Sequence, residues 1–487
     1  MTSKLPVKIN KKIRLEEILY IFIIICPILD AASFLFRNYF NTSLSISTIL
    51  RPIIPIVVII YIFFKDKIKV PLIIGGFTYT IYAALHLYIF NFLRTQSSYG
   101  NIIRELQYLV NYTFMIMNLF IYIYVFIFRK SEEKREIKIA KIRKSILISF
   151  TLYIVIIFVS ILTGTSSSTY TEDRMGYKGW FESGNSVGAI MIIMLFALLP
   201  KLTEKINRKI KTWLIIDIIL AGIYLSTLLG TRVGLFGFVL TIGIYIVCQG
   251  VYNLYHREKI NKKILGIGTG VLVVISIFIV LFGSMTITRR RLLQERSNDI
   301  IDESTGEASH VTGDALEFVK KIKNKELSEE YMKEDVQAAL IDLYNFNNNH
   351  KIPYTNMRMI QMVYHCSLVK EQSNLALILF GNGYMTHYRE MIFEMEVPAF
   401  LCNFGVYGFI LYFMPFFIIA IVGVFYLIKN IKNISVEAIM SILGVCFAIA
   451  ISFFSGYTFF NQSAATIITV MCVITINEII KLKGEKN

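Results

Sequence analysis

The chain has 487 residues, of which 55% are hydrophobic and only 17% are charged. Soluble domains carry about 25% charged residues, so this composition excludes an ordinary soluble globular protein. A net charge of +16 can indicate nucleic-acid binding, but here the basic residues follow the connections between apolar blocks and therefore mark membrane topology.

Twelve apolar blocks follow one another along the chain. About 20 mainly apolar residues can cross the hydrocarbon core as a helix, and helices are favoured because a backbone exposed to lipid must satisfy its own hydrogen bonds. The predicted spans are Leu15–Phe36, Ser47–Phe64, Val70–Phe90, Leu106–Phe128, Ile146–Leu162, Ser186–Leu199, Trp213–Leu229, Val233–Val247, Ile264–Phe282, Val397–Leu427, Val436–Phe454 and Phe459–Ile480. We therefore expect an all-α integral membrane protein. The first block is too long for a signal peptide and lacks a small-residue cleavage site.

Basic residues recur at every second connection and predict the orientation. They occupy both tails and the connections 65–69, 129–144, 201–211, 257–263 and 429–432. The positive-inside rule places this set in the cytoplasm. Twelve spans also require both termini on one side, so both arguments predict cytoplasmic termini.

The longest polar segment separates the ninth and tenth spans. It covers residues 284–396, contains no candidate span, and shows helix-like spacing of Leu340, Leu343 and Tyr344. We expect a small, largely helical extracytoplasmic domain. The predicted organisation is therefore spans one to nine in residues 1–283, this domain in 284–396, and spans ten to twelve in 397–487.

Nucleotide-binding and zinc-site motifs are missing from the sequence. It contains no P-loop and no HExxH, and five of its six cysteines lie in apolar blocks. No Cys/His cluster has the spacing of a zinc site. We therefore expect neither a metal nor another cofactor.

Several cationic residues depart from the positive-inside trend. Arg174 and Lys178 precede the sixth span, Arg232 lies in the short turn after the seventh, Arg51 opens the second, and Arg104 precedes the fourth. Arginine binds phosphate oxygens with two parallel hydrogen bonds and keeps its proton. These residues predict a phosphate or pyrophosphate site, most simply for a lipid-linked ligand. The alternative for Arg232 is an interfacial anchor.

Three acids are candidates for chemistry. Asp30 lies within the first span, where an acid is a functional candidate by default; the alternative is a structural partner for one of the arginines. Glu394 and Glu396 stand where the polar segment returns to the membrane. Sugar transfer to a hydroxyl needs a general base, and one of the two glutamates is expected to supply it. The alternative is an ordinary acidic helix start.

Three stretches resemble one family. "GYKGWFESGNSVGAIMIIMLFALLP" is similar to a loop that leads into a helix, "LLGTRVGLFGF" to a short basic turn, and "LFGNGY" with "FEMEVPAFLCNFGVYGFILYF" to the end of a large outer loop. The family is the bacterial O-antigen ligase/O-antigen polymerase superfamily, in particular its capsule and exopolysaccharide polymerase-like members.

The resemblance implies a GT-C-like membrane glycosyltransferase of the cell envelope. Its donor would be a glycan on undecaprenyl (polyprenyl) pyrophosphate, used without metal or nucleotide sugar. The likeness assigns pyrophosphate binding to Arg174 and Arg232, and we add Lys178 and Arg51 to that set. Glu182 and Asn185, in the same polar loop, are expected to support the head-group site.

The predicted function is polymerisation of lipid-linked repeat units at the outer face of the bacterial cytoplasmic membrane. The ligase branch places a histidine in the returning loop, whereas this chain has glutamates there and His387 is offset. This difference favours a polymerase. Ligation of a finished glycan to another acceptor and transport by a lipid-oligosaccharide flippase are the alternatives. Expected partners are the lipid-linked glycan, membrane lipid and other polysaccharide-export proteins, with no nucleic acid.

Overall fold

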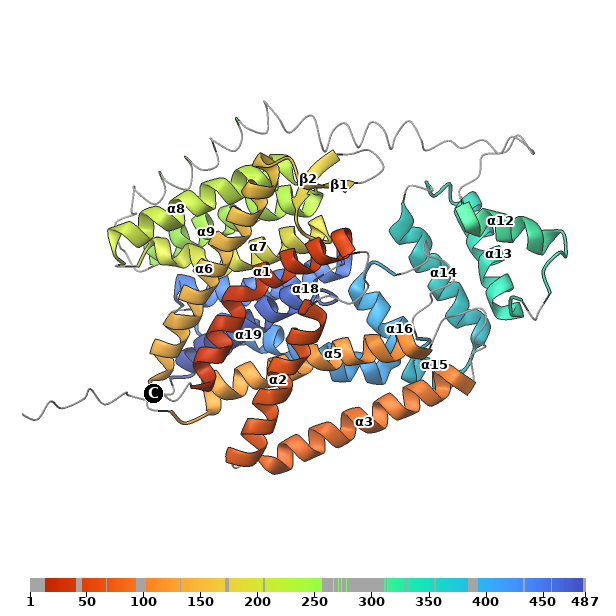
Figure 1. Cartoon of the computed structure of the whole chain (residues 1–487), viewed down its shortest axis with the longest axis horizontal. Helices are drawn as coiled ribbons and strands as arrows, with labels where there is room; N and C mark the ends of the chain where they lie inside the picture. The colour runs from red at the N-terminus through yellow and green to blue at the C-terminus, as the bar shows by residue number, and fades with distance from the viewer. Residues whose placement is uncertain are drawn as a thin grey trace, which may run out of the picture.

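Long helices make up most of the computed structural model (Figure 1). The structure describes residues 14–40, 46–66, 68–92, 102–131, 133–170, 175–204, 206–255, 313–328, 331–353, 356–383, 393–431, 434–456 and 458–484, together with 266, 270, 273, 277 and 311.

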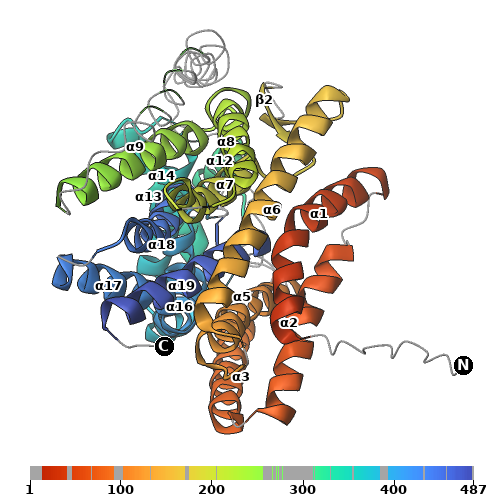
Figure 2. The same ribbon diagram turned by 90° about the vertical axis from the view of Figure 1, so that its left-hand side faces the viewer.

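The first helices pass back and forth beside one another. They are α1 (Leu15–Phe40), α2 (Ile46–Lys65), α3 (Lys69–Phe92), α5 (Ile102–Ile123), the π-helical turn η1 (Tyr124–Phe128) and α6 (Arg135–Leu162). In Figure 2, α6 runs between α1 and the group that contains α7 and α8, and it packs on all three.

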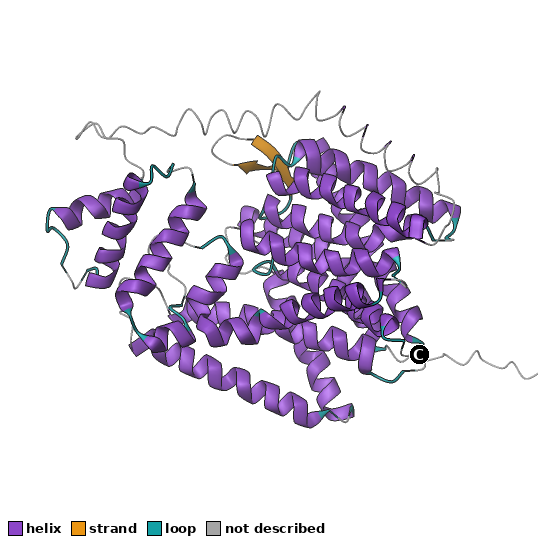
Figure 3. Ribbon diagram, turned by 180° about the vertical axis from the view of Figure 1, so that it is seen from behind, coloured by secondary structure: helices purple, strands orange, loops and turns teal. Residues whose placement is uncertain are grey.

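A short hairpin interrupts the helices. Strands β1 (Ser167–Tyr170) and β2 (Met175–Gly179) pair antiparallel and lie at one end of the bundle (Figure 3). The following helices are α7 (Gly184–Leu198), the 3₁₀ turn η2 (Leu199–Leu202), α8 (Arg208–Ile223), the π-helical turn η3 (Tyr224–Leu228) and α9 (Arg232–Tyr255).

The described part of the long polar segment holds four helices. They are α12 (Gly313–Lys323), α13 (Glu334–Asn349), α14 (Met357–Gln372) and α15 (Leu375–Phe380). Leu340 and Leu343, which the spacing picked out, are buried with Tyr364 and Leu368 in a small apolar core of their own. These helices lie to one side of the bundle (Figure 1).

The chain closes with α16 (Glu396–Tyr412), α17 (Met414–Lys429), α18 (Val436–Phe454) and α19 (Gln462–Leu482). At the centre, α19 packs against α7, α5 and α18. The sequence of α7 is apolar on every face, which is typical of a helix enclosed by others, and its residues from Ser186 to Leu198 are buried.

The predicted all-α membrane fold is confirmed. Among the described residues, nine helices are long and apolar enough to span a membrane, and α16 with α17, bent by 51°, makes a tenth if the pair is one span. The predicted span Ser47–Phe64 coincides with α2, whereas most of Ile264–Phe282 lies outside the described residues. The total of twelve spans stays a prediction.

Gly405 interrupts α16 and allows the polar segment to dock there. Its φ of 68° is one that glycine adopts without strain. A helix break frees the carbonyls of the preceding turn. Those of Cys402 and Asn403 accept hydrogen bonds from the backbone N–H groups of Asn382 and Gly383, at 2.9 and 2.7 Å. Close backbone contact thus accounts for Gly381 and Gly405, whereas Gly383 and Gly408 lie against side chains of α3.

A buried polar pair fixes the end of α15 on the bundle. His86 Nε2 lies 2.8 Å from Glu105 Oε1, and both side chains are wholly buried. His86 Nδ1 lies 2.5 Å from the carbonyl oxygen of Phe380. A carbonyl oxygen can only accept, so Nδ1 carries a proton. This contact ties α15 to α3 and α5.

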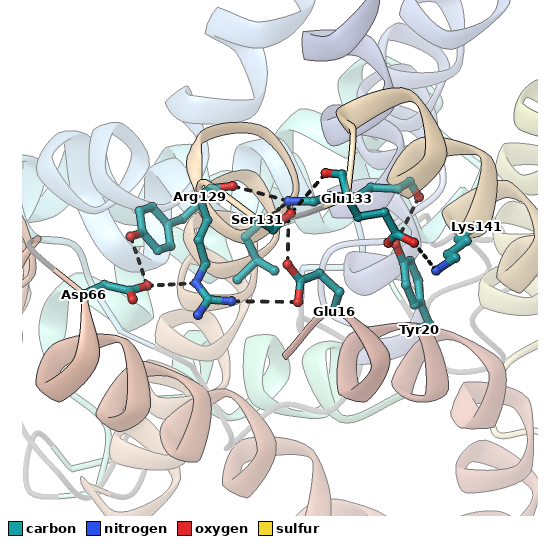
Figure 4. Close-up of polar contacts among 10 residues, drawn as sticks. Glu16, Tyr20, Asp66, Arg129, Ser131, Glu133 and Lys141 are labelled. Atoms are coloured by element: carbon teal, nitrogen blue, oxygen red, sulfur yellow. Dashed lines mark hydrogen bonds and ion pairs between the residues drawn. The ribbon is translucent and has the colours of Figure 1, made fainter. Parts of the chain in front are cut away.

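A charge network joins the first turn of α1, the residue after α2 and the start of α6 (Figure 4), and α6 runs from there towards the hairpin (Figure 2). Arg129 Nε lies 3.0 Å from Asp66 Oδ2, and Arg129 Nη1 lies 3.7 Å from Glu16 Oε2. Lys138, almost fully buried, lies 3.6 Å from Glu16 Oε1 and donates to the Val125 carbonyl. Two cations thus neutralise two carboxylates, as burial requires.

Replacement of Arg129 by alanine should destabilise the protein. Glu16 and Asp66 would lose a shared cation, and breaking a buried pair from one side costs about 3–5 kcal/mol. Because Arg129 is 20% exposed, we expect the lower end of that range. The measurement is thermal unfolding in detergent, with the exposed Lys144→Ala as control. An unchanged Tm would show that the network adds no stability.

Candidate functional site

A cavity of about 260 Å³ opens at the hairpin end of the bundle. Helices α1, α2, α5, α7 and α19 contribute to it, together with the turns that precede α7 and α19. Its lining residues are Asp30, Ser33, Arg37, Arg51, Gln107, Asn111, Phe181, Glu182, Ser183, Ser186, Val187, Ile190, Phe460, Asn461 and Gln462. The wall therefore combines two cations, two acids, four side-chain amides and two aromatic rings.

The inner part of the cavity is built on a buried ion pair. Arg51 Nη2 lies 2.5 Å from Asp30 Oδ1, and the two side chains are only 7% and 14% exposed. Arg51 Nη2 also donates to Ser463 Oγ at 2.9 Å, and Tyr153 donates to Asp30 Oδ2 at 2.8 Å. Both oxygens of Asp30 are thus engaged. Arg51 Nε is buried and has no hydrogen-bond partner among the described residues.

The mouth of the cavity carries a second, looser ion pair. Arg37, in the last turn of α1, lies 3.3 Å from Glu182 Oε1, and the two side chains are 45% and 47% exposed. An exposed ion pair contributes about 0–1 kcal/mol to the stability of the protein. Removing one partner of a buried pair costs far more than that. The Arg37–Glu182 pair is therefore the one that a ligand can displace at little cost.

Lys178 on β2 adds a further cation beside the mouth. Its Nζ donates to the backbone oxygen of Glu182 at 3.1 Å. Burial lowers the pKa of Lys178, and the carboxylate of Glu182 opposes that shift. The turn before α7 is thus bracketed by two basic side chains, from α1 and from the hairpin.

Amides and aromatic rings form the wall on the side of α5 and α19. Gln462 donates to Asn111 Oδ1 at 3.0 Å. Asn461 caps α19 by accepting from the backbone N–H groups of Ser463 and Ala464. Amides both donate and accept, which suits a ligand rich in hydroxyls, and a few placed polar groups on an apolar wall are typical of ligand sites. A smaller cavity of about 40 Å³ adjoins here, since Asn111, Phe460 and Gln462 line both.

Glu396 holds the turn that supplies Phe460, Asn461 and Gln462. Wholly buried at the start of α16, it accepts from Thr458 Oγ1 at 2.5 Å and from the Phe460 backbone N–H at 2.7 Å. Glu396 therefore shapes the cavity without lining it.

Glu394 lies on the other side of the same turn. Its Oε2 is 3.6 Å from Arg358 Nε, and its backbone N–H donates to Gln361 at 3.0 Å. A methyl group on Gly456 would come within 1.7 Å of the Glu394 carbonyl oxygen, so the two backbones are in close contact. Glu394 is not among the residues that line the cavity.

The two motif stretches around α7 and α9 pack together. Thr169 on β1 donates to the Leu229 carbonyl at 2.8 Å, and a Cβ on Gly176 would lie 2.5 Å from that same oxygen. Gly188 on α7 faces Leu229 and Thr231 in the same way. The hairpin therefore rests on the turn that leads into α9.

The predicted cations of these stretches lie at different places. Arg232 is the exposed first residue of α9, beside the hairpin, and does not line the cavity. Arg104 lies in the first turn of α5 and Asn185 in the first turn of α7. Arg174 and His387 fall outside the described residues. Of the predicted set, the structure brings Asp30, Arg51 and Glu182 into one cavity, with Lys178 beside its mouth.

Among the lining residues that the sequence analysis did not name are one cation and all four side-chain amides. They are Arg37, Gln107, Asn111, Asn461 and Gln462. Arg37 carried a usable signal, because it is one more basic residue at the hairpin end of a span. The amides carried none, since single amides near span ends are common.

The stretch "GNSVG" at the start of α7 fits the Gly-x-Ser-x-Gly pattern of hydrolases, whose serine needs a histidine base. Ser186 lines the cavity, but no histidine is among the lining residues. Gly184 and Gly188 serve close packing instead, since a Cβ on either would press against Leu229 at 3.2 or 3.1 Å. In this protein the two glycines of the pattern allow α7 to pack closely against Leu229, and the pattern does not indicate a hydrolase site.

Comparison with known proteins identifies the family. Residues 12–485 match the model of the family described as O-antigen ligase like membrane protein. Comparison with curated proteins gives no significant match. Since the match covers nearly the whole chain, the protein belongs to the family of O-antigen ligase-like membrane proteins.

Proposed function

We propose that this protein polymerises polyprenyl-pyrophosphate-linked repeat units into a cell-surface polysaccharide at the outer face of the bacterial cytoplasmic membrane. The family points to glycan transfer in the membrane. The observation that carries the finer proposal is the cavity, which places cations, amides and aromatic rings together at the end of a membrane bundle. Cations suit the pyrophosphate, and amides suit sugar hydroxyls.

The chemistry needs two things from the protein. The developing charge on the leaving pyrophosphate must be stabilised, which preorganised cations do well in a site that excludes water. The acceptor hydroxyl must lose its proton to a base. In this proposal Arg37 and Arg51 face the donor within the cavity. Lys178 and Arg232 approach the pyrophosphate from the hairpin side, and Arg174 stays a predicted ligand of it.

The hairpin end of the bundle is, in this proposal, the outer face. Arginine recognises phosphate through its fixed fork, which lysine lacks. The donor's polyprenyl chain would stay in the bilayer while its head group enters between α1 and α7, whose residues Arg37 and Ser186 both line the cavity. We also propose that the reaction needs no metal ion and that both termini of the chain lie in the cytoplasm.

Purified protein should elongate lipid-linked repeat units in detergent without any other protein. The expected product is a ladder of lipid-linked oligomers, and a deletion strain should accumulate single lipid-linked repeats. Transfer of finished chains to another acceptor without elongation would instead establish the ligase that the family's description favours. Absence of any transfer, with movement of lipid-linked glycan across vesicles, would establish the flippase.

A further inference from the structure

The two acids of the cavity differ in availability. Asp30 is engaged through both oxygens, by Arg51 and by Tyr153, and is mostly buried. Glu182 stands at the mouth, half exposed, opposite Arg37. An acid that already accepts two short hydrogen bonds is poorly placed to accept a proton from a substrate. Glu182 is therefore the lining acid that a substrate hydroxyl can reach.

The two cations differ in the same way. Arg51 is fixed by Asp30 and Ser463. Arg37 lies 3.3 Å from a single exposed acid, Glu182. An anion that binds arginine more strongly than a carboxylate can therefore displace Glu182. A pyrophosphate carries more charge than a carboxylate and matches the arginine fork with several oxygens.

We propose that the donor's pyrophosphate takes Arg37 away from Glu182, and that the carboxylate released in this way accepts the proton of the acceptor hydroxyl. Glu182, and neither Glu394 nor Glu396, is then the base. This inference rests on the proposed function and adds an order of events to it, because the base becomes available only after the donor has bound.

The transfer step moves one proton and exchanges one bond at the anomeric carbon. The acceptor O–H bond breaks and its proton passes to a carboxylate oxygen of Glu182. The acceptor oxygen forms a bond to the anomeric carbon of the donor sugar. The bond from that carbon to the pyrophosphate oxygen breaks, and its electron pair leaves with the polyprenyl pyrophosphate. Glu182 then returns the proton to solvent at the open mouth, and Arg37 can pair with it again.

Among the described residues, the charged groups around the pair are Lys178, Asp30 and Arg51. Lys178 donates to the Glu182 backbone oxygen and keeps the turn in place when Arg37 leaves. Asp30 and Arg51 line the same cavity but neutralise one another. With Arg37 turned to the donor, Lys178 stays beside the turn that carries Glu182.

The test uses the opposite signs that the proposal predicts for the two partners. Arg37→Ala should weaken binding of sugar-free polyprenyl pyrophosphate by roughly tenfold or more, the loss expected for a hydrogen bond between charged groups. Glu182→Gln should bind that probe at least as tightly as wild type, because a competitor for Arg37 is gone. Its transfer rate should nevertheless fall by about 10²–10⁴-fold, the usual contribution of a general base.

The control is an exposed ion pair on α13 and α14, away from the cavity lining. Lys370 Nζ lies 2.9 Å from Asp342 Oδ2, and Asp342→Asn should change neither binding nor rate. If Glu182→Gln also weakens probe binding, the pair is only structural and the inference fails. Transfer at the wild-type rate in Glu182→Gln overturns it as well. If the Gln variant unfolds, Glu182→Asp replaces it, and it should keep probe binding and part of the rate.

Failure of wild type to transfer any glycan would remove the proposed function itself, so the two failures are distinguishable.

Discussion

Replacing Arg51 with alanine is expected to abolish most glycan transfer and also to destabilise the protein. The change leaves Asp30 buried beside Tyr153 without its cation, and breaking such a pair from one side costs about 3–5 kcal/mol. It also removes the hydrogen bond that Arg51 Nη2 donates to the Oγ of Ser463, in the first turn of α19. The inner wall of the cavity should therefore lose its shape. Turnover and thermal unfolding in detergent are the two measurements.

Two further variants serve as comparisons. Arg51→Lys keeps the positive charge but lacks the planar fork of arginine, so its transfer rate should lie between those of wild type and Arg51→Ala. Arg129→Ala should also lose stability, but the protein that stays folded should transfer glycan normally, because Arg129 is not among the residues that line the cavity. Full activity in Arg51→Ala would instead favour a donor site that is built on Arg174 and Arg232.

The membrane helices were predictable because lipid imposes one simple rule on them. Twenty apolar residues in a row have one stable solution, and the predicted span Val436–Phe454 coincides with α18. The break at Gly405 was not predictable, because it depends on Asn382 and Gly383 docking from a distant segment. Hydropathy reports burial in lipid and says nothing of which backbone groups will meet.

The candidate site was predictable only in part, for a related reason. Exceptions to the charge rule pointed to Arg51, and an acid within a span pointed to Asp30, whose pairing with Arg51 the structure shows. The same rule applied to Arg37 would have found the mouth of the cavity. Gln462 and Asn111 meet across 351 positions of sequence, and no local pattern marks such a pair.

Replacing Glu396 with alanine should both destabilise the protein and lower the rate of glycan transfer. In Glu396→Ala, the Phe460 N–H and the Thr458 hydroxyl lose their acceptor in a buried place. Each unsatisfied group costs about 1–3 kcal/mol, and the turn that carries Asn461 and Gln462 should shift. A displacement of about 1 Å at a binding wall can lower a rate by about 10²-fold.

The Gln variants decide between the positioning role of Glu396 and the general-base role that the sequence predicts for it or Glu394. Glu396→Gln keeps one acceptor oxygen but presents an N–H to a second donor, so it should lower both transfer and binding of polyprenyl pyrophosphate. Glu394→Gln should be nearly silent, because its contacts with Arg358 and Gln361 lie outside the cavity. A true base would behave differently, since its Gln variant would bind the donor normally and lose only turnover. Normal binding with lost turnover in either Gln variant would therefore restore that glutamate as the base and displace Glu182.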